Sequence, residues 1–214
     1  DQLNLTVAKA NALTLTHKDA QNNYVLDQQI VINSDATVSI LDTAANIAHL
    51  SAREIGYLHD IGVDTIKVLN NDDASVDPLS ITVEQYLALN DVIFDGDSDV
   101  TISDKAANLA KLKGDEIAAL ADNGIDHINI TDATLDLTVD QASKWPEGVT
   151  FTDAHQVRIV DAGAEISKLS ADQITVLSVA GVDAIDATNT DSTITLTTLQ
   201  AKALGNGKII IASD

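Results

Sequence analysis

Short stretches of the chain alternate apolar and polar residues, and segments with a helical pattern lie between them. In residues 37–42, apolar Val38 and Ile40 alternate with polar residues, which is typical of a strand with one buried face, and residues 63–68 are also predicted to form a strand. Between them, Ile55, Leu58 and Ile61 recur at the spacing of one helix face. Strands that alternate with short helices favour parallel strands and an α/β fold.

Polar residues and glycine mark where these helices begin and end. Asp42 ends the first strand and is predicted to cap a short helix. A second helix is predicted to start at Ser51, because Ser51 and Glu54 have the spacing of a capping box. Gly62 is predicted to end that helix in the left-handed conformation, which a side chain makes costly. The other elements predicted here are strands over residues 81–83 and 92–94 and a helix over residues 84–89.

Three segments of the chain resemble one another and form an internal repeat. They read TVSILDTAANIAHLSAREIGYLHDIGVDTI, DVTISDKAANLAKLKGDEIAALADNGIDHI and QVRIVDAGAEISKLSADQITVLSVAGVDAI. Each copy has an anchor aspartate, at intervals of 62 and 57 residues: Asp42, Asp104 and Asp161. A glycine follows each anchor by 20 residues and an aspartate by 22, namely Gly62, Gly124 and Gly181, and Asp64, Asp126 and Asp183. Lys113 takes the cap position in the second copy, so that helix is expected to begin less firmly.

A second element recurs four times, as LTVAKA from Leu5, ITVEQY from Ile81, LTVDQA from Leu137 and LTTLQA from Leu196. Residues 1–34 are therefore interpreted as the end of a partial repeat, followed by repeats over residues 35–94, 95–152 and 153–214. The final KIIIASD is interpreted as the strand that opens another repeat. We predict a stacked, solenoid-like α/β array of strand–helix–helix–strand units, about three repeats of 57–62 residues, cut from a longer array.

The charge of the chain limits the classes of molecule that it can bind. The formal net charge is −21, which repels phosphate, so nucleic acid is excluded as a partner. No apolar run reaches the roughly 18 residues that span a bilayer, so no membrane span is expected. Of the 33 acidic residues, 28 are aspartate. Aspartate favours turns, helix caps and sites for hard cations, so the excess predicts many capped turns and candidate calcium ligands.

The sharpest acidic cluster is DGDSDVTISD, with Asp95, Asp97, Asp99 and Asp104 as candidate calcium ligands. A bent loop can bring alternate carboxylates around one cation, although the segment lacks the glycine and glutamate of an EF-hand. The alternative is a solvated turn in which Asp104 caps a helix. A second cluster, Asp72, Asp73 and Asp77 with Asn70 and Asn71, lies in an insertion and is interpreted as a solvated loop.

No catalytic constellation is evident, and we expect no catalytic residues and no enzyme activity. The anchor aspartates are better explained as caps, since each copy needs the same turn. The five histidines form no HExxH or HxxxH pair, and no nucleophile elbow, phosphate loop or dinucleotide fingerprint is present. Trp145 is expected to cover the edge of the core.

Residues 103–142, SDKAANLAKLKGDEIAALADNGIDHINITDATLDLTVDQA, resemble repeat modules of large, acidic, cysteine-free surface and secreted proteins of Gram-negative bacteria, similar to type-I-secreted, RTX-associated adhesins. The resemblance implies an extracellular or cell-surface location and a non-catalytic structural or adhesive role. It implies as partners the neighbouring repeats of a longer chain, the protein itself, or cell-surface polysaccharide. The glycine-rich GGxGxD nonapeptide of such proteins is absent from the sequence. The alternatives are an accessory module of a secreted polysaccharide-acting enzyme and a self-assembling surface-layer or filament subunit.

Overall fold

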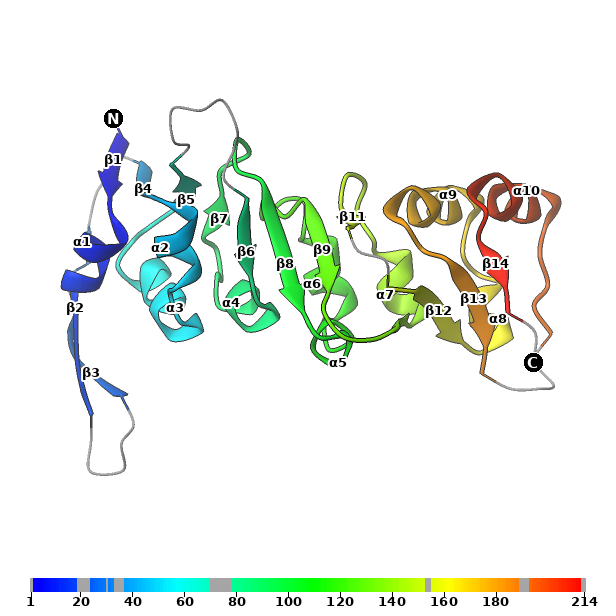
Figure 1. Ribbon diagram of the computed structural model, residues 1–214, viewed down its shortest axis with the longest axis horizontal. Coiled ribbons are helices and arrows are strands. Elements are labelled where there is room, and N and C mark those ends of the chain that lie inside the picture. The colour runs from blue at the N-terminus through cyan, green and yellow to red at the C-terminus, as the bar shows by residue number, and fades with distance from the viewer. Residues whose placement is uncertain are drawn as a thin grey trace. The chain divides into compact units, whose positions relative to one another are not determined.

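A computed structural model describes residues 2–18, 24–29, 31–32, 37–69, 78–152, 155–188 and 193–212. The chain folds into two compact units, residues 1–101 and 102–214, and the division falls inside one strand. Both units alternate short strands with short helices (Figure 1). The protein therefore has the mixed α/β fold with parallel sheets that the sequence predicts.

The main sheet of the first unit has the strand order β1-β4-β5-β7, and its neighbouring strands run parallel. In chain order the elements of this unit are β1 (Gln2–Leu5), α1 (Val7–Ala12), β2 (Thr14–Lys18), β3 (Tyr24–Gln29), β4 (Thr37–Asp42), α2 (Ala44–Ala48), α3 (Ala52–Asp60), β5 (Thr65–Val68), β6 (Leu79–Ile81), α4 (Val83–Leu87) and β7 (Ile93–Phe94). Ile40 stands opposite Leu5 on one side and Ile66 on the other. Residues in register lie on the same face of a sheet, so these side chains line one face.

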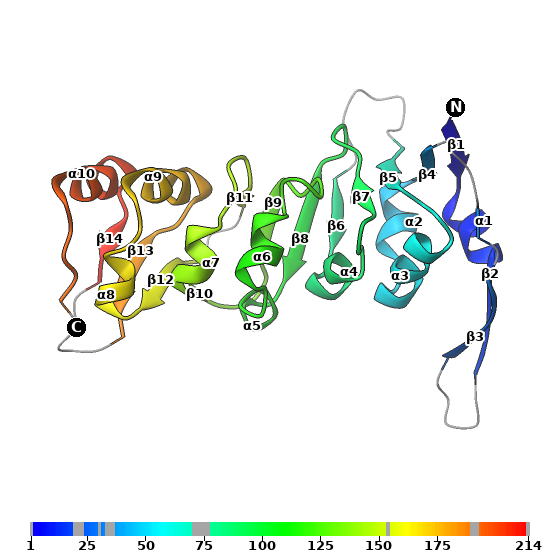
Figure 2. The ribbon, with the colours of Figure 1, turned by 180° about the vertical axis from the view of Figure 1, so that it is seen from behind.

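The second unit has the same arrangement in its sheet β10-β12-β13-β14, whose neighbouring strands are also parallel. Its elements are β8 (Val100–Asp104), which crosses the division, α5 (Ala106–Leu109), α6 (Gly114–Ala118), β9 (His127–Ile130), β10 (Leu135–Leu137), α7 (Val139–Ser143), β11 (Thr150–Phe151), β12 (Val157–Asp161), α8 (Gly163–Ile166), α9 (Ala171–Ala180), β13 (Ala184–Ala187), α10 (Thr198–Gly207) and β14 (Ile210–Ile211). Strand β9 pairs in parallel with β11. Helices α9 and α10 pack side by side in both views (Figure 1, Figure 2).

The core of each unit is built from equivalent positions of the sequence repeats. Ile47, Leu109 and Ile166 lie in the short helices α2, α5 and α8, and all three are buried. Ile55, Leu58 and Ile61 are buried as the helical spacing predicts. The same apolar pattern therefore leads to the same burial wherever it recurs.

Most predicted helix boundaries are confirmed. The capping boxes at Ser51 and Ser170 are present. Gly62, Gly124 and Gly181 have φ of 89°, 76° and 102°, in the left-handed region. The amide of Lys113 donates to Glu116 at 2.7 Å, but no side-chain oxygen caps α6 there, as predicted.

The cap prediction for Asp42 is wrong by one residue. Asp42 is still part of β4, opposite Val68, and the hydroxyl of Thr43 caps α2 by accepting from the amide of Asn46. A capping side chain accepts from the amide two or three residues further on, whereas the carboxylate of Asp42 accepts from the adjacent amide of Thr43 and from the side chain of Asn46. The same shift places Lys105 and Ala162 at the caps of α5 and α8.

Two other features differ from the sequence interpretation. Strands β2 and β3 form an antiparallel hairpin, which the expectation of parallel strands did not include. The final strand β14 pairs with β13 as β7 pairs with β5, with Ile210 opposite Ala184 and Ile93 opposite Thr65. KIIIASD therefore closes a repeat and does not open one.

Within the described ranges, no helix is long and apolar enough to cross a membrane.

Candidate functional site

The anchor aspartates share one arrangement of hydrogen bonds. Oδ1 of Asp42 accepts from the amide of Thr43 at 2.8 Å and from the side chain of Asn46 at 2.7 Å. Oδ1 of Asp104 accepts from Lys105 and Asn108 at 2.8 Å each. The amide of Ala162 donates to Oδ1 of the third anchor, Asp161, at 2.8 Å, and Glu165 stands where the other two copies have the asparagine. The anchors therefore hold the turn from strand to helix in place.

Two of the anchors also hold a helix that precedes them in the chain. Oδ2 of Asp42 accepts from the amide of Val7 at 3.0 Å, and Oδ2 of Asp161 accepts from the amide of Val139 at 3.0 Å. These amides begin α1 and α7, and the strands just before them pair with the strands that carry the anchors. We call this combination of strand pairing and aspartate–amide hydrogen bond a junction. Each unit contains such a junction, at Asp42 in the first unit and at Asp161 in the second.

The pKa of Asp42 reflects these contacts. Burial alone would raise it, but the hydrogen bonds from Asn46, Thr43 and Val7 favour the ionised form and lower the pKa below its ordinary value. The carboxylate is therefore charged at neutral pH and serves as a fixed acceptor for backbone and side-chain donors.

The second recurring aspartate, which follows each anchor by 22 residues, joins neighbouring strands, a role that its spacing alone does not predict. Oδ2 of Asp64 accepts from the amide of Val38 at 2.7 Å, while the amide of Asp64 donates to the carbonyl of Val38. Asp183 and Val157 make the same pair of contacts, with a side-chain distance of 2.8 Å. Each pair fixes the register between an opening strand and the strand that follows the left-handed glycine.

Three buried glutamines form a further recurring contact that sequence reasoning did not find. Nε2 of Gln141 donates to the carbonyls of Ala110 and Leu112, at 3.1 and 2.6 Å. Gln85 bonds Ala48 and Leu50 at the same distances, and Gln200 bonds Ser167 and Leu169 at 3.0 and 2.6 Å. In each case Oε1 accepts from the amide of the capping threonine. The available signal was glutamine three residues after threonine in three of the four copies of the second element.

The predicted calcium ligands are only partly brought together. Nζ of Lys67 lies 3.0 Å from Oδ2 of Asp97 and 3.5 Å from Oδ1 of Asp95, and the hydrogen bond to Asp97 raises the pKa of Lys67. The amide of Asp97 donates to Oδ1 of Asp95. The backbone carbonyl of Asp99 accepts a hydrogen bond from the amide of Leu79. Asp104 belongs to the second unit, where its carboxylate holds the turn before α5.

In the part of the chain that the structure describes, no group of three or more His, Asp or Glu side chains is placed to hold a metal ion. The second acidic cluster, Asp72, Asp73 and Asp77, lies outside the described residues. The calcium site therefore stays a prediction.

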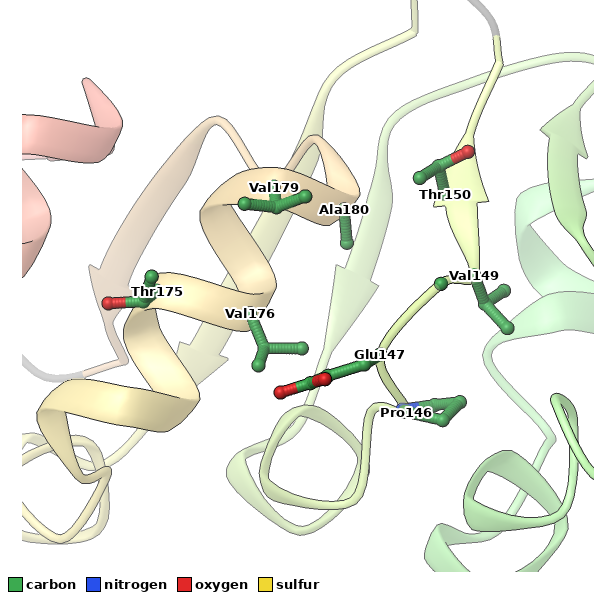
Figure 3. A pocket seen from close by; sticks show the side chains of 9 residues that line it. Pro146, Glu147, Val149, Thr150, Thr175, Val176, Val179 and Ala180 are labelled. Atoms are coloured by element: carbon green, nitrogen blue, oxygen red, sulfur yellow. The ribbon is translucent and has the colours of Figure 1, made fainter.

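The second unit contains an apolar cavity of about 330 Å³ between α9 and the loop before β11 (Figure 3). Val176 and Val179 of α9 and Pro146 and Val149 of the loop line the cavity, and Glu147 extends from the loop toward α9. Trp145 is buried beside it, as expected, and its indole N–H donates to the carbonyl of Val149. The cavity can take up an apolar group, and its single carboxylate does not form an acid–base pair with another lining residue.

The first unit contains a more polar cavity of about 310 Å³ beside its junction. Asp42, Asn46, His49 and Glu54 line it together with Asn11 of α1. Asp42 bonds Val7 and Asn46, and Glu54 bonds the amide and hydroxyl of Ser51. Its carboxylates are therefore committed to the backbone and the caps.

The chain matches no family model, no curated protein and no solved structure.

Proposed function

We propose that this chain is a non-catalytic structural and adhesive repeat segment of a large extracellular bacterial protein. In this proposal the strand–helix–helix–strand units stack into a solenoid-like array. The observation that supports it is the recurrence of one set of contacts: anchor aspartate, strand-linking aspartate and buried glutamine. The anchor aspartates fix the turn from strand to helix, and the strand-linking aspartates and glutamines bind backbone groups 26 to 35 residues away, as expected for a structural scaffold.

The absence of catalysis is part of the proposal and follows from what these carboxylates bind. A catalytic carboxylate must reach a substrate with a free oxygen. The oxygens of Asp42 and Asp161 instead accept from backbone amides on two sides. These carboxylates therefore stabilise the positions of helices and strands.

The test exposes the purified chain to a panel of bacterial surface polysaccharides and measures both binding and the release of reducing sugar. We expect no release, with binding to at least one polysaccharide in immobilised form and none by heat-unfolded chain. Release that a single aspartate substitution abolishes would instead favour the accessory module of a polysaccharide-acting enzyme. Concentration-dependent growth of long particles, measured by sedimentation, would favour the self-assembling subunit.

Calcium stabilisation is a second part of the proposal, centred on Asp95, Asp97 and Asp99. Lys67 already occupies the space between two of these carboxylates, so a cation must compete with its ammonium group. We expect Lys67→Ala to raise the midpoint gain in millimolar calcium, and Asp97→Asn to remove it. Equal midpoints in calcium and in sodium of matched ionic strength, for both variants, would show that only general screening acts.

A further inference from the structure

The residues before α10 differ from their counterparts in one respect. In the two junctions, the residues just before the capping threonine form a strand, β1 or β10. Residues 193–197 precede α10 in the same way, yet no strand is formed there. Leu135 and Leu137 of β10 are 1% and 2% exposed, whereas the equivalent Ile194 and Leu196 are only half-buried.

Strand β10 exists because an opening strand lies beside it. It pairs in parallel with β12, and the amide of Leu135 donates to the carbonyl of Gln156 just before that strand. The amide of Leu79 makes the equivalent bond to the carbonyl of Asp99. Ile194 has the same position relative to its helix as Leu135 and Leu79, but none of the described strands lies beside its segment.

The start of α10 points to the same partner. The first amides of α1 and α7 each donate to an anchor aspartate. The first amide of α10 belongs to Thr198, and no described side chain accepts from it. An anchor aspartate supplied by a following opening strand would complete this helix as Asp161 completes α7.

The exposed strand β14 gives a third observation. Phe151, at the end of β11, packs against Gly181 of the next repeat, where a Cβ would lie 3.6 Å from the Phe151 Cβ. Ile32 lies against Gly62 in the same way, and its amide donates to the carbonyl of Ile61. By register Ile211 is the counterpart of Phe151, and it is 47% exposed.

We propose that residues 193–198 and β14 together form a docking edge for one further repeat of the same type. The occupant must bring a parallel opening strand for Ile194–Leu196, an anchor aspartate for the Thr198 amide and a left-handed glycine for Ile211. The strand pairing and the aspartate–amide hydrogen bond required at this edge are the same as those made in the two junctions already described. A second copy of this chain offers no free opening strand in its first unit, because β4 already pairs with β1. The inference rests on the stacked array of the proposed function.

The experiment extends the full chain by joining a second copy of residues 155–214 directly after Asp214. Phe151 and Val157 are six residues apart, and this extension places its opening strand six residues after Ile211. Amide exchange is measured residue by residue in the parent and extended chains. We expect exchange at Ile194, Leu196 and Thr198 to slow about tenfold or more on extension, because hydrogen-bonded amides open less often.

The matched control carries Asp161→Ala in the appended copy only. Exchange at Thr198 should then return to the parent rate, while Ile194 and Leu196 stay slow. The inference is overturned if the three amides are already slow in the parent, if extension leaves them fast, or if the appended copy stays unfolded. The Val139 amide reports the existing junction: fast exchange there in the parent would contradict the stacked array itself, whereas slow exchange with an unchanged edge contradicts only the docking edge.

Discussion

Replacing Gln141 with leucine tests whether the buried glutamines stabilise the fold. Leucine has nearly the same volume, so the substitution removes hydrogen bonds while leaving little new cavity. Gln141 is 6% exposed, and its side chain bonds the carbonyls of Ala110 and Leu112 and the amide of Thr138. All three contacts are lost in the variant.

The size of the effect follows from these contacts. A hydrogen bond contributes a net 0.5–1.5 kcal/mol, roughly, and a buried group left without a partner costs about 1–3 kcal/mol. The bond to Leu112 is the shortest of the three, at 2.6 Å, and is buried. We therefore expect Gln141→Leu to lower the free energy of unfolding of the second unit by about 3 kcal/mol.

Gln173→Leu is the matched control. Gln173 also completes a capping box, and its Nε2 donates to a single carbonyl, that of Ser143, at 3.0 Å. It is less buried than Gln141, so we expect a loss of about 1 kcal/mol. Trp145, the one tryptophan of the chain, lies in the second unit, so urea unfolding followed by its fluorescence reports this unit for both variants. Equal losses in the two variants would refute the reasoning.

Three further predictions concern charge and glycine. The pKa of Asp42 is lower in the folded chain than the ordinary value near 3.9, so the stabilisation from its carboxylate is present above about pH 4 and is lost as the pH falls through the lower folded pKa. The exchange rate of the Val7 amide, corrected for the intrinsic rate, should therefore rise in acid. Asp42→Asn should make this amide exchange fast at every pH. Gly205→Ala should stabilise α10 by about 0.5–1 kcal/mol because the new Cβ would enter open space. Gly207→Ala should destabilise the helix because the new Cβ would lie 2.5 Å from the Cβ of Ser178. Thermal unfolding of both variants checks that the two changes in stability have opposite signs. Arg158→Met should cost no more than about 1 kcal/mol, a loss that shrinks in 1 M salt, because the ion pairs of this arginine are partly exposed; the same urea titration at two salt concentrations measures it.

The helices and strands could be predicted because their signals are local. The capping box at Ser51 and the left-handed Gly62 act within a few residues, so both are readable in the sequence. The cap at Asp42 was misplaced because the end of β4 depends on pairing with β5, which lies further along the chain. A local pattern gives the turn, and the partner strand decides which residue begins it.

The contacts of the site were less predictable because they connect distant residues. Gln141 bonds carbonyls 29 and 31 residues before it. Asp97 accepts a hydrogen bond from Lys67, which is 30 residues away in the sequence. The sequence of the acidic cluster alone therefore does not show that a lysine ammonium group lies beside it. Only the topology of the fold brings these groups together.

Each of two anchor aspartates has one carboxylate oxygen for its own repeat and one for the repeat before it. In the proposed array, a duplication of one whole repeat would also copy these attachment contacts, so the array could lengthen without a new interface having to evolve. The double role of the anchor aspartate would also limit which residues could change after a duplication. A substitution at an anchor would remove hydrogen bonds from two repeats at once, whereas a substitution at an exposed position such as Leu199 would remove none of them.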